Sequence, residues 1–250
     1  MRLADQAVHE GNWLFRHRSF LPLLLLPLVA LAVPDAVGIE RRVGEGWHDA
    51  WGAACLVVSL AGLALRAVTV GYAPDGTSGR DTRAQRAEVL NTSGVYSVVR
   101  HPLYIGNSVA MLGIVCSLMV PWLAGMTVLL LWLYHERIML AEEHFLRGKF
   151  GESFDRWTEQ TPAVLPAFSL WRPPTRPFSW RRVLRSEFNG LLAIVSVFTL
   201  VEAATDMRLA GIGPAEWMRR DWGWVAVFAA AAAIFLVLAT IKKGTAWLRD

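Results

Sequence analysis

Two groups of polar residues flank one long apolar stretch near the middle of the chain. Arg100 and His101 come immediately before the stretch, and Glu142 and Glu143 follow it. A guanidinium clamps a carboxylate through two hydrogen bonds, and a glutamate accepts bonds from an amino group or from ribose hydroxyls. Ionisable side chains beside a lipid-soluble segment are energetically expensive and commonly functional. We therefore expect these four side chains to form one binding site, provided that the apolar stretch folds back on itself.

The composition predicts that this site lies in an integral membrane protein. The chain is 54% hydrophobic, and only 18% of its residues are charged. About 20 apolar residues cross the hydrocarbon core of a bilayer. The apolar runs long enough for this are Phe20–Ile39, Ala50–Gly71, Leu103–Tyr134, Phe188–Ala204 and Trp222–Ile241.

The central run, Leu103–Tyr134, is too long for a single crossing. As one helix it would measure roughly 48 Å, against a hydrocarbon core of about 30 Å. Pro121 lies in its middle, where the ring removes a backbone donor and disfavours helix just before it. Two antiparallel helices, about Tyr104–Met119 and Trp122–Leu140, fit better. The predicted fold class is therefore all-α: a polytopic membrane protein of about six transmembrane helices, with a central helical hairpin and a cytosolic pocket.

The positions of the positive charges predict the orientation. Most of the 25 Lys and Arg residues fall in the N-terminal arm, in residues 72–101 and 135–187, and in the C-terminal tail. Because such residues concentrate in cytoplasmic loops, six spans with both termini in the cytoplasm place both halves of the site there. We expect a multi-pass protein of the bacterial inner membrane. The net charge of +4 then reflects topology, and no nucleic-acid partner is expected.

The chain is expected to form a single membrane domain, residues 1–250. Its parts would be two N-terminal spans in 19–71, a core with the site in 72–166, an interfacial segment in 167–187 and two additional spans in 188–250. Within the core, the polar loop Ala73–Ser97 is expected to cap the site. A short helix is expected at Thr82–Leu90.

The local sequence also predicts how the polar residues are presented. Pro102 pushes His101 out of helical geometry and suits the first position of a helix, whose free amides would attract an anion. Glu142 and Glu143 are adjacent, so on a helix they point about 100° apart. We expect one of them to face the ligand and the other to pair with Arg147.

The remaining polar residues are assigned ordinary roles. Arg66, inside the second span, is expected to reach the headgroups, and His135 and His144 are expected on a helix surface. Glu202 and Asp206 are expected to be solvated. No metal site is expected, because the six histidines contain no HxxxH pair; this also disfavours a diiron hydroxylase.

An ordered series of motifs resembles the superfamily of isoprenylcysteine carboxyl methyltransferases and phospholipid methyltransferases. The series consists of Gly94-Val-Tyr96, Arg100-His-Pro-Leu-Tyr104-Ile-Gly106, a helical hairpin, Glu142-Glu143, Phe150-Gly151-Glu152, and then Pro162 and Pro166. It covers about Arg66 to Pro166. The resemblance implies a multi-span helical membrane enzyme that uses S-adenosylmethionine without a Rossmann domain.

The resemblance also implies roles for individual residues. The implied cofactor-binding residues are Gln85, Leu90, Asn91, Tyr96, His101, Pro102, Leu103, Tyr104 and Glu142. The candidate catalytic residues are Arg100, His101, Glu143 and Arg137. Arg137 is included because it neighbours Ile138, which occupies the position of a substrate-binding arginine in the isoprenylcysteine enzymes. That departure speaks against a prenylcysteine substrate.

The expected reaction is methyl transfer from S-adenosylmethionine to a lipid or another membrane-embedded small molecule with a carboxylate, amine or thiol acceptor. A carboxylate acceptor needs no general base, whereas an amine or hydroxyl would need one, with Glu143, His144 or Glu136 as candidates. Two alternatives stay open: an NADPH-dependent membrane reductase of the sterol or steroid reductase type, and a non-catalytic membrane scaffold. The acceptor, the role of the last two spans and a homodimer also stay open.

Overall fold

The described residues, 2–74 and 85–244 of the computed structural model, are mainly helical and contain no β-strand. Their α-helices are α1 (Leu3–His17), α2 (Leu25–Val43), α3 (Glu45–Tyr72), α4 (Pro102–Ser117), α5 (Pro121–Phe150), α6 (Glu152–Gln160), α7 (Trp180–Ala210), α8 (Pro214–Arg220) and α9 (Trp222–Gly244). Three short 3-10 helices occupy Leu21–Leu24, Val95–Ser97 and Phe168–Leu170. The all-α prediction is confirmed.

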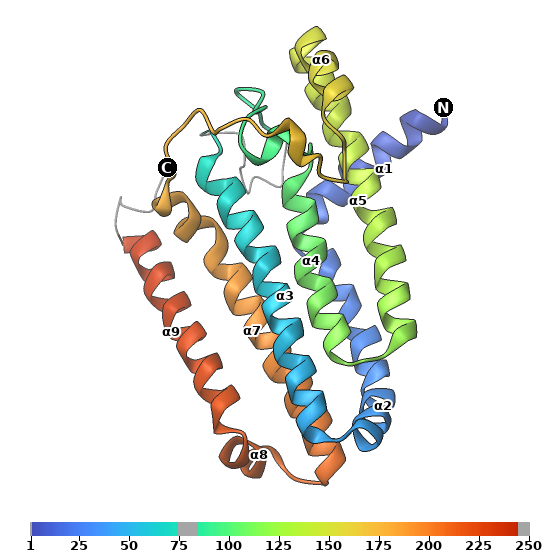
Figure 1. The fold of residues 1–250 in the computed structure, drawn as a ribbon, viewed down its shortest axis with the longest axis vertical. Coiled ribbons are helices and arrows are strands. Elements are labelled where there is room, and N and C mark those ends of the chain that lie inside the picture. The colour runs from blue at the N-terminus through green and yellow to red at the C-terminus, as the bar shows by residue number, and fades with distance from the viewer. Residues whose placement is uncertain (1, 75–84, 245–250) are drawn as a thin grey trace.

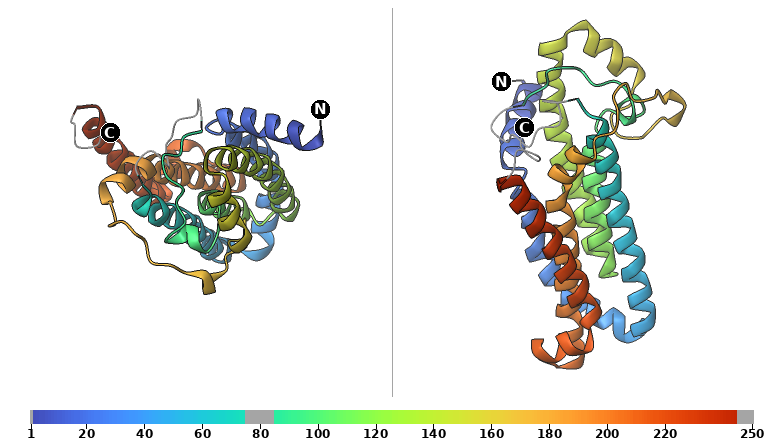
Figure 2. Two further views of the ribbon diagram at one scale, coloured as in Figure 1. Left: turned by 90° about the horizontal axis from the view of Figure 1, so that it is seen from above. Right: turned by 90° about the vertical axis from the view of Figure 1, so that its left-hand side faces the viewer.

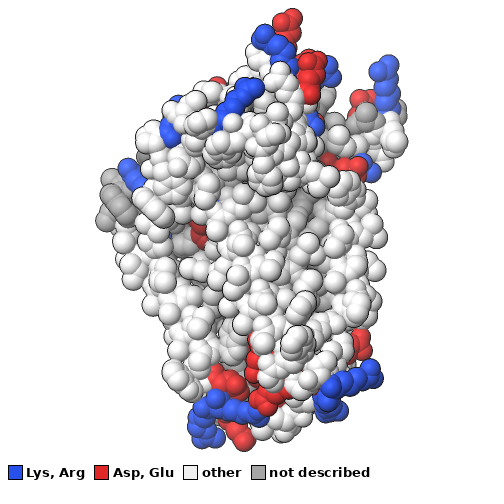
Figure 3. All heavy atoms as spheres, in the orientation of Figure 1, with Lys and Arg blue, Asp and Glu red and all other residues white. Residues whose placement is uncertain are grey.

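The long helices α2, α3, α4, α5, α7 and α9 run side by side in one bundle (Figures 1 and 2). The short helices α6 and α8 lie at opposite ends of it, and α1 crosses the α6 end against α5 (Figure 1). Charged side chains gather at the two ends, and the band between them is almost free of charge on the face shown in Figure 3. The bundle thus has the charge distribution of a membrane-spanning protein.

Five helices are long and apolar enough to cross a bilayer. They are Pro22–Val43, Glu45–Tyr72, Pro121–Phe150, Trp180–Ala210 and Trp222–Gly244. The sixth expected span, α4, is apolar but has only 16 residues, which corresponds to roughly 24 Å. The polytopic membrane architecture is therefore confirmed, although α4 is shorter than a full crossing of about 30 Å.

The central hairpin forms where the sequence predicts it. α4 ends at Ser117, and α5 begins at Pro121, which occupies the first turn of the helix. Proline is favoured there because its missing N–H would have no intrahelical partner. The turn therefore reverses the chain and brings the C-terminal half of α5 back beside the start of α4 (Figure 1).

Small residues let α3 approach α4 closely. A Cβ added to Gly62 would collide with the carbonyl of Gly106, and one added to Gly113 would collide with Ser59. Ser59 Oγ donates a 2.8 Å hydrogen bond to the carbonyl of Ala110. Close backbone contact through small residues is a common way of holding membrane helices together.

Two local expectations differ from the structure. The described part of the expected helix at Thr82–Leu90, residues 85–90, is not helical, and residues 82–84 lie outside the described residues. α7 begins at Trp180, inside the segment expected at the lipid interface. Ser179 caps α7 by accepting a hydrogen bond from the backbone N–H of Arg182. The pattern of hydrophobic residues alone does not indicate this helix start.

Candidate active site

The junction before α4 positions Arg100 and His101. Pro102 opens the helix, and His101 takes the non-helical N-cap position with φ −123° and ψ 56°. His101 is buried, with 5% of its surface exposed. The backbone N–H of Arg100 is fixed separately by a 2.9 Å hydrogen bond to the carbonyl of Pro162.

The return of α5 places two carboxylates against His101. Its Nε2 lies 2.9 Å from Glu143 Oε1, and its Nδ1 lies 3.6 Å from Glu142 Oε2. The same Glu143 oxygen is 3.4 Å from an Nη of Arg100. These four residues form what we call the hairpin cluster, which joins the two sequence motifs that the apolar stretch separates.

The prediction that one of the two glutamates pairs with Arg147 is wrong. Both contact His101, because the imidazole lies between them and presents a different nitrogen to each. Arg147 instead pairs with Asp155 of α6, whose carboxylate lies 2.9 Å from its Nε. A flat ring with two nitrogens accommodates the angle between neighbouring helical side chains.

The hairpin cluster favours a charged imidazole. Burial alone would lower the pKa of His101, but the hydrogen bonds and negative charges of Glu142 and Glu143 outweigh it and raise the pKa above its ordinary value. The raised pKa favours the protonated, positively charged form of His101. With Arg100, it places two cations beside two carboxylates at the N-terminus of α4.

Aromatic residues enclose the cluster on the α4 side. Tyr104 interacts with Glu142, and its ring lies 5.8 Å from that of His101 and 5.3 Å from that of His135. His135 is buried, and its Nδ1 is 3.0 Å from Ser108 Oγ. The expectation that His135 lies on a helix surface is wrong, since it packs inside the hairpin.

A segment after α6 holds the chain that leads into the cluster. This strap, residues 162–172, accepts the hydrogen bond from Arg100 and a 2.9 Å bond from Gly94 N–H to the carbonyl of Arg172. The backbone N–H of Ala167 in turn donates to the carbonyl of Val98 at 2.9 Å. The strap thus fixes residues 94–100 through these main-chain bonds and through a 2.9 Å hydrogen bond from the backbone N–H of Arg172 to Ser97 Oγ.

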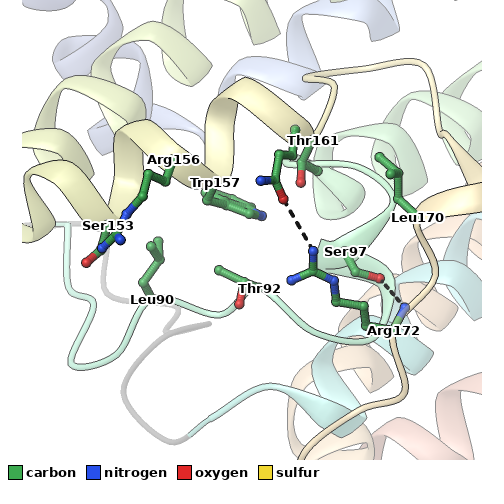
Figure 4. Close-up of a pocket in the computed structure, with 10 residues that line it drawn as sticks. Leu90, Thr92, Ser97, Ser153, Arg156, Trp157, Thr161, Leu170 and Arg172 are labelled. Atoms are coloured by element: carbon green, nitrogen blue, oxygen red, sulfur yellow. Dashed lines mark hydrogen bonds between the residues drawn. The ribbon is translucent and has the colours of Figure 1, made fainter.

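A cavity of about 380 Å³ lies between the strap, α6 and the loop before α4 (Figure 4). Leu90 and Thr92 line one side of it, and Trp157 and Arg172 line others. The residues that line the cavity do not include any member of the hairpin cluster. Trp157 Nε1, on the cavity wall, donates a 3.3 Å hydrogen bond to the carbonyl of Tyr96, which precedes the hairpin cluster in the chain.

The predicted cofactor residues fall into two groups. Tyr96, His101, Pro102, Leu103, Tyr104 and Glu142 come from the hairpin cluster and the chain around it. Leu90 lines the cavity, Asn91 accepts a 3.3 Å bond from the N–H of Ser93, and Gln85 lies 3.5 Å from Asn12 on α1. Burial raises the pKa of Tyr96, so its phenol is neutral at physiological pH.

Arg137 is not part of the hairpin cluster. Its Nε lies 3.4 Å from Glu10 on α1, and an Nη lies 3.8 Å from Glu136. Arg137 thus belongs to the contact between α1 and α5. This contact is hard to foresee from the sequence, because the polar residues of α1 resemble those of a solvated arm.

Sequence reasoning also missed a network centred on Arg66. This side chain binds Glu187 with both Nε and an Nη, at 2.8 and 2.9 Å, and donates to Asn107 at 2.9 Å. The expectation that Arg66 reaches the headgroups is therefore wrong. Arg66 thus joins α3 to α7 through Glu187 and to α4 through Asn107. Glu187 lies 121 residues from Arg66 in the chain.

Comparison with known proteins places this architecture in a family. Residues 50–153 match the family model described as phospholipid methyltransferase. Over 85 residues, 34% of this chain, the sequence is 28% identical to the protein-S-isoprenylcysteine O-methyltransferase of Schizosaccharomyces pombe, of which it covers 36%. The helical hairpin and its motifs therefore define the class: the chain belongs to the isoprenylcysteine carboxyl methyltransferase and phospholipid methyltransferase superfamily of integral membrane proteins.

Within this class, the chain is similar over most of its length to two bacterial proteins. It is 34% identical to the nickel-cobalt-cadmium resistance protein NccN of Alcaligenes xylosoxydans xylosoxydans, covering 77% of this chain and 88% of the relative. It is 32% identical to the cobalt-zinc-cadmium resistance protein CzcN of Cupriavidus metallidurans, covering 79% and 88%. No solved structure matches the chain significantly.

Proposed function

We propose that this protein transfers a methyl group from S-adenosylmethionine to a lipid or another small molecule in the membrane. The observation that carries the proposal is the hairpin cluster, in which Arg100 and His101 meet Glu142 and Glu143 at the N-terminus of α4. The superfamily supports it, because this class includes methyltransferases that act on lipidated or lipid substrates.

The chemistry of the donor set fits the cofactor. S-adenosylmethionine carries a carboxylate, an ammonium and a ribose, and it supplies a methyl group activated by a sulfonium. Arg100, charged His101 and the free amides of α4 suit the carboxylate, and Glu142 suits the ammonium or the ribose hydroxyls. Arg100 Nε is buried without a hydrogen-bond partner among the described residues, so this guanidinium retains capacity for a further acceptor.

The residues would act mainly by holding donor and acceptor in line. Such positioning contributes about 7–11 kcal/mol toward lowering a barrier without a covalent enzyme intermediate. A carboxylate acceptor needs no further help. For an amine or hydroxyl acceptor, Glu143 is the group we assign to receive the proton, because its carboxylate belongs to the hairpin cluster and lies 2.9 Å from His101 Nε2.

The acceptor is proposed to differ from prenylcysteine. Ile138 stands where the resemblance implies a substrate-binding arginine, and its side chain is completely buried. The neighbouring Arg137 is paired with Glu10 and Glu136. An anionic prenylcysteine carboxylate therefore lacks its expected partner here, which favours another membrane-borne acceptor.

Calorimetry on the purified full-length protein tests the proposal. S-adenosylhomocysteine should bind, whereas NADPH should not; the reverse result would support the membrane reductase alternative. His101→Ala and Glu142→Ala should each abolish binding, and Glu152→Ala, an exposed carboxylate at the same end, should leave it unchanged. Unimpaired binding in both cluster variants would refute the assignment, and failure to bind either cofactor would favour a scaffold.

A second proposal concerns the cellular role. The relatives that match most of this chain are named for resistance to nickel, cobalt, zinc and cadmium, so we propose that the methyl transfer supports metal tolerance. Cells lacking the gene should grow less well in Ni²⁺, Co²⁺ or Cd²⁺. Restoration by the parent gene but not by His101→Ala would tie tolerance to the hairpin cluster, and restoration by both would separate them.

A further inference from the structure

A second polar cluster lies at the α8 end, where α2, α3 and α7 meet. His48 and Asp49 are on the first turns of α3, and Glu202 is near the far end of α7. Their ligand atoms lie within 4.8 Å of one another. Glu202 is half-buried, so the expectation that it is simply solvated is wrong. We call these three residues the α8-end cluster.

The buried histidine is the independent sign that this cluster receives a ligand. His48 is only 2% exposed, yet neither ring nitrogen has a hydrogen-bond partner among the described residues. Glu40 is equally buried, and its unpartnered Oε2 lies 3.9 Å from His48 Nδ1, too far for a hydrogen bond. Buried polar groups left unpaired are costly and rare, so several such atoms in one place call for a partner.

The charges around the cluster favour a cation as this partner. Four carboxylates lie close enough to repel the negative charge of Glu202: Asp206, Asp49, Glu40 and Asp221. Arg220 is close by, but its guanidinium is engaged by Glu45 at 2.6 Å and by Asp221 at 4.0 Å. Asp206 accepts a 2.9 Å hydrogen bond from Trp217 Nε1, and its side chain is partly exposed. Acidic side chains are visible at this end in Figure 3.

We propose that His48, Asp49 and Glu202 bind a divalent transition-metal ion such as Zn²⁺, Co²⁺ or Ni²⁺. One imidazole with two carboxylates is a donor set that these ions accept. Two ligands about 2.0–2.2 Å from a metal stand at most about 4.4 Å apart, so the observed spread needs only a small inward movement. Asp49 is exposed and provides access from solvent.

Glu40 completes the arrangement without being one of the three ligands. Metal-bound histidines are commonly oriented by a carboxylate that accepts a bond from the other ring nitrogen. Glu40 Oε2, at 3.9 Å from His48 Nδ1, is placed for this once the ring shifts toward the metal. The site lies at the opposite end of the bundle from the hairpin cluster (Figure 1), so it is distinct from the proposed methyl-transfer site.

Cobalt titration of the chelator-stripped, full-length protein in detergent tests the site. Co²⁺ should bind saturably and stoichiometrically with a visible ligand-field absorption band, and Zn²⁺ should displace it. Asp49→Asn and Glu202→Gln should each weaken Co²⁺ binding at least about tenfold, since loss of a partner even one step behind a metal ligand has that effect. His48→Gln should abolish the band.

Two matched variants separate this site from others. Glu216→Gln removes an exposed carboxylate at the same end, and His101→Gln removes the histidine of the hairpin cluster; both should bind Co²⁺ like the parent. Because Asp49 is exposed, Asp49→Asn is expected to fold even if His48→Gln does not, and thermal melts check this. Unchanged Co²⁺ affinity in folded Asp49→Asn and Glu202→Gln, absence of saturable binding, or loss of binding in His101→Gln would each overturn the proposal.

Discussion

The two ends of this bundle carry polar clusters of opposite character. In the hairpin cluster, the charges are balanced: two cations meet two carboxylates within 2.9–3.6 Å. In the α8-end cluster, a histidine without hydrogen-bond partners among the described residues stands beside several carboxylates. A balanced set suits a zwitterionic organic molecule, since it offers both signs of charge. An acidic set with a free imidazole suits a metal cation.

The difference arises from how each cluster is assembled. The hairpin cluster comes from a single helical hairpin, α4 and α5. The turn between these helices brings the negative charges of Glu142 and Glu143 to the positive side chains before α4. The α8-end cluster draws on α3 and α7, which lie far apart along the chain. Its carboxylates repel one another, and a bound cation would offset that repulsion.

The largest expected effect is that a substitution in one cluster impairs binding of that cluster's ligand and spares the ligand of the other cluster. His101→Ala should abolish S-adenosylhomocysteine binding, because it removes a charged partner and leaves two carboxylates uncompensated, while Co²⁺ binding should persist. Asp49→Asn should weaken Co²⁺ binding at least about tenfold and leave S-adenosylhomocysteine binding unchanged. Calorimetry and absorbance on the same preparations give both readouts. If either substitution removed both ligands, the two clusters would be one system and the contrast would fail.

Breaking the Arg66 network should destabilise the bundle rather than one ligand site. Arg66→Ala leaves Glu187, 7% exposed, without its partner, and removal of one member of a buried ion pair costs about 3–5 kcal/mol. Unfolding in mixed micelles with increasing SDS measures this free energy. Arg66→Lys is the matched control, since it keeps the charge but loses the two-bond geometry, and it should cost less. Equal losses in both variants would contradict the importance of the charge.

Overpacking the seam between α3 and α4 should have a smaller effect. Gly113→Ala places a methyl group against Ser59 and the carbonyl of Cys55, and such crowding typically costs about 1–3 kcal/mol. Gly125→Ala, on α5 with open space around it, should be neutral or slightly stabilising. The same SDS titration compares the two. A neutral Gly113→Ala would show that the seam can open without penalty.

The smallest expected effect is on pH dependence, and it should distinguish the clusters. The pKa of His101 is raised by Glu142 and Glu143 against the opposing effect of burial, so its positive charge is complete below about pH 6.5. Its contribution to folding and to binding an anion is lost as the pH rises through the raised pKa. S-adenosylhomocysteine affinity should therefore fall at alkaline pH, by about tenfold per unit once His101 deprotonates.

His101→Gln should flatten that profile, because glutamine does not titrate in this range. Co²⁺ affinity should show the opposite slope at low pH, since metal ligands must be deprotonated. Titrations of both ligands across the same buffers provide the comparison. An alkaline decline that survives in His101→Gln would assign the titrating group elsewhere.

Much of the fold follows from short-range rules. The excess length of the central apolar run and Pro121 within it require a reversal, and Pro102 determines where α4 begins. Gly151, at φ 51°, ends α5, since a glycine with positive φ is a common helix terminator. Because these signals are local, the amino-acid sequence alone predicts the hairpin and the meeting of its two motifs.

The remaining features depend on contacts between distant segments. Nothing in the sequence near Arg66 indicates Glu187, and nothing near His48 indicates Glu202. The predicted partner of Arg147 is wrong because helical spacing favours Glu143, whereas Asp155 approaches only after the chain turns at Gly151. The sequence therefore identifies which side chains can react, but three-dimensional packing decides their partners.

The strap extends the structural unit of the hairpin cluster along the chain. Three of its bonds to residues 94–100 join main-chain atoms to main-chain atoms, and a fourth runs from the backbone N–H of Arg172 to Ser97 Oγ. The three main-chain bonds do not depend on side-chain identity. The family model ends at residue 153, although the scaffold of the hairpin cluster continues to residue 172. Replacements along the strap that keep its main-chain path should therefore leave these three bonds in place, and the structural unit around the hairpin cluster reaches beyond the residues that the family model matches.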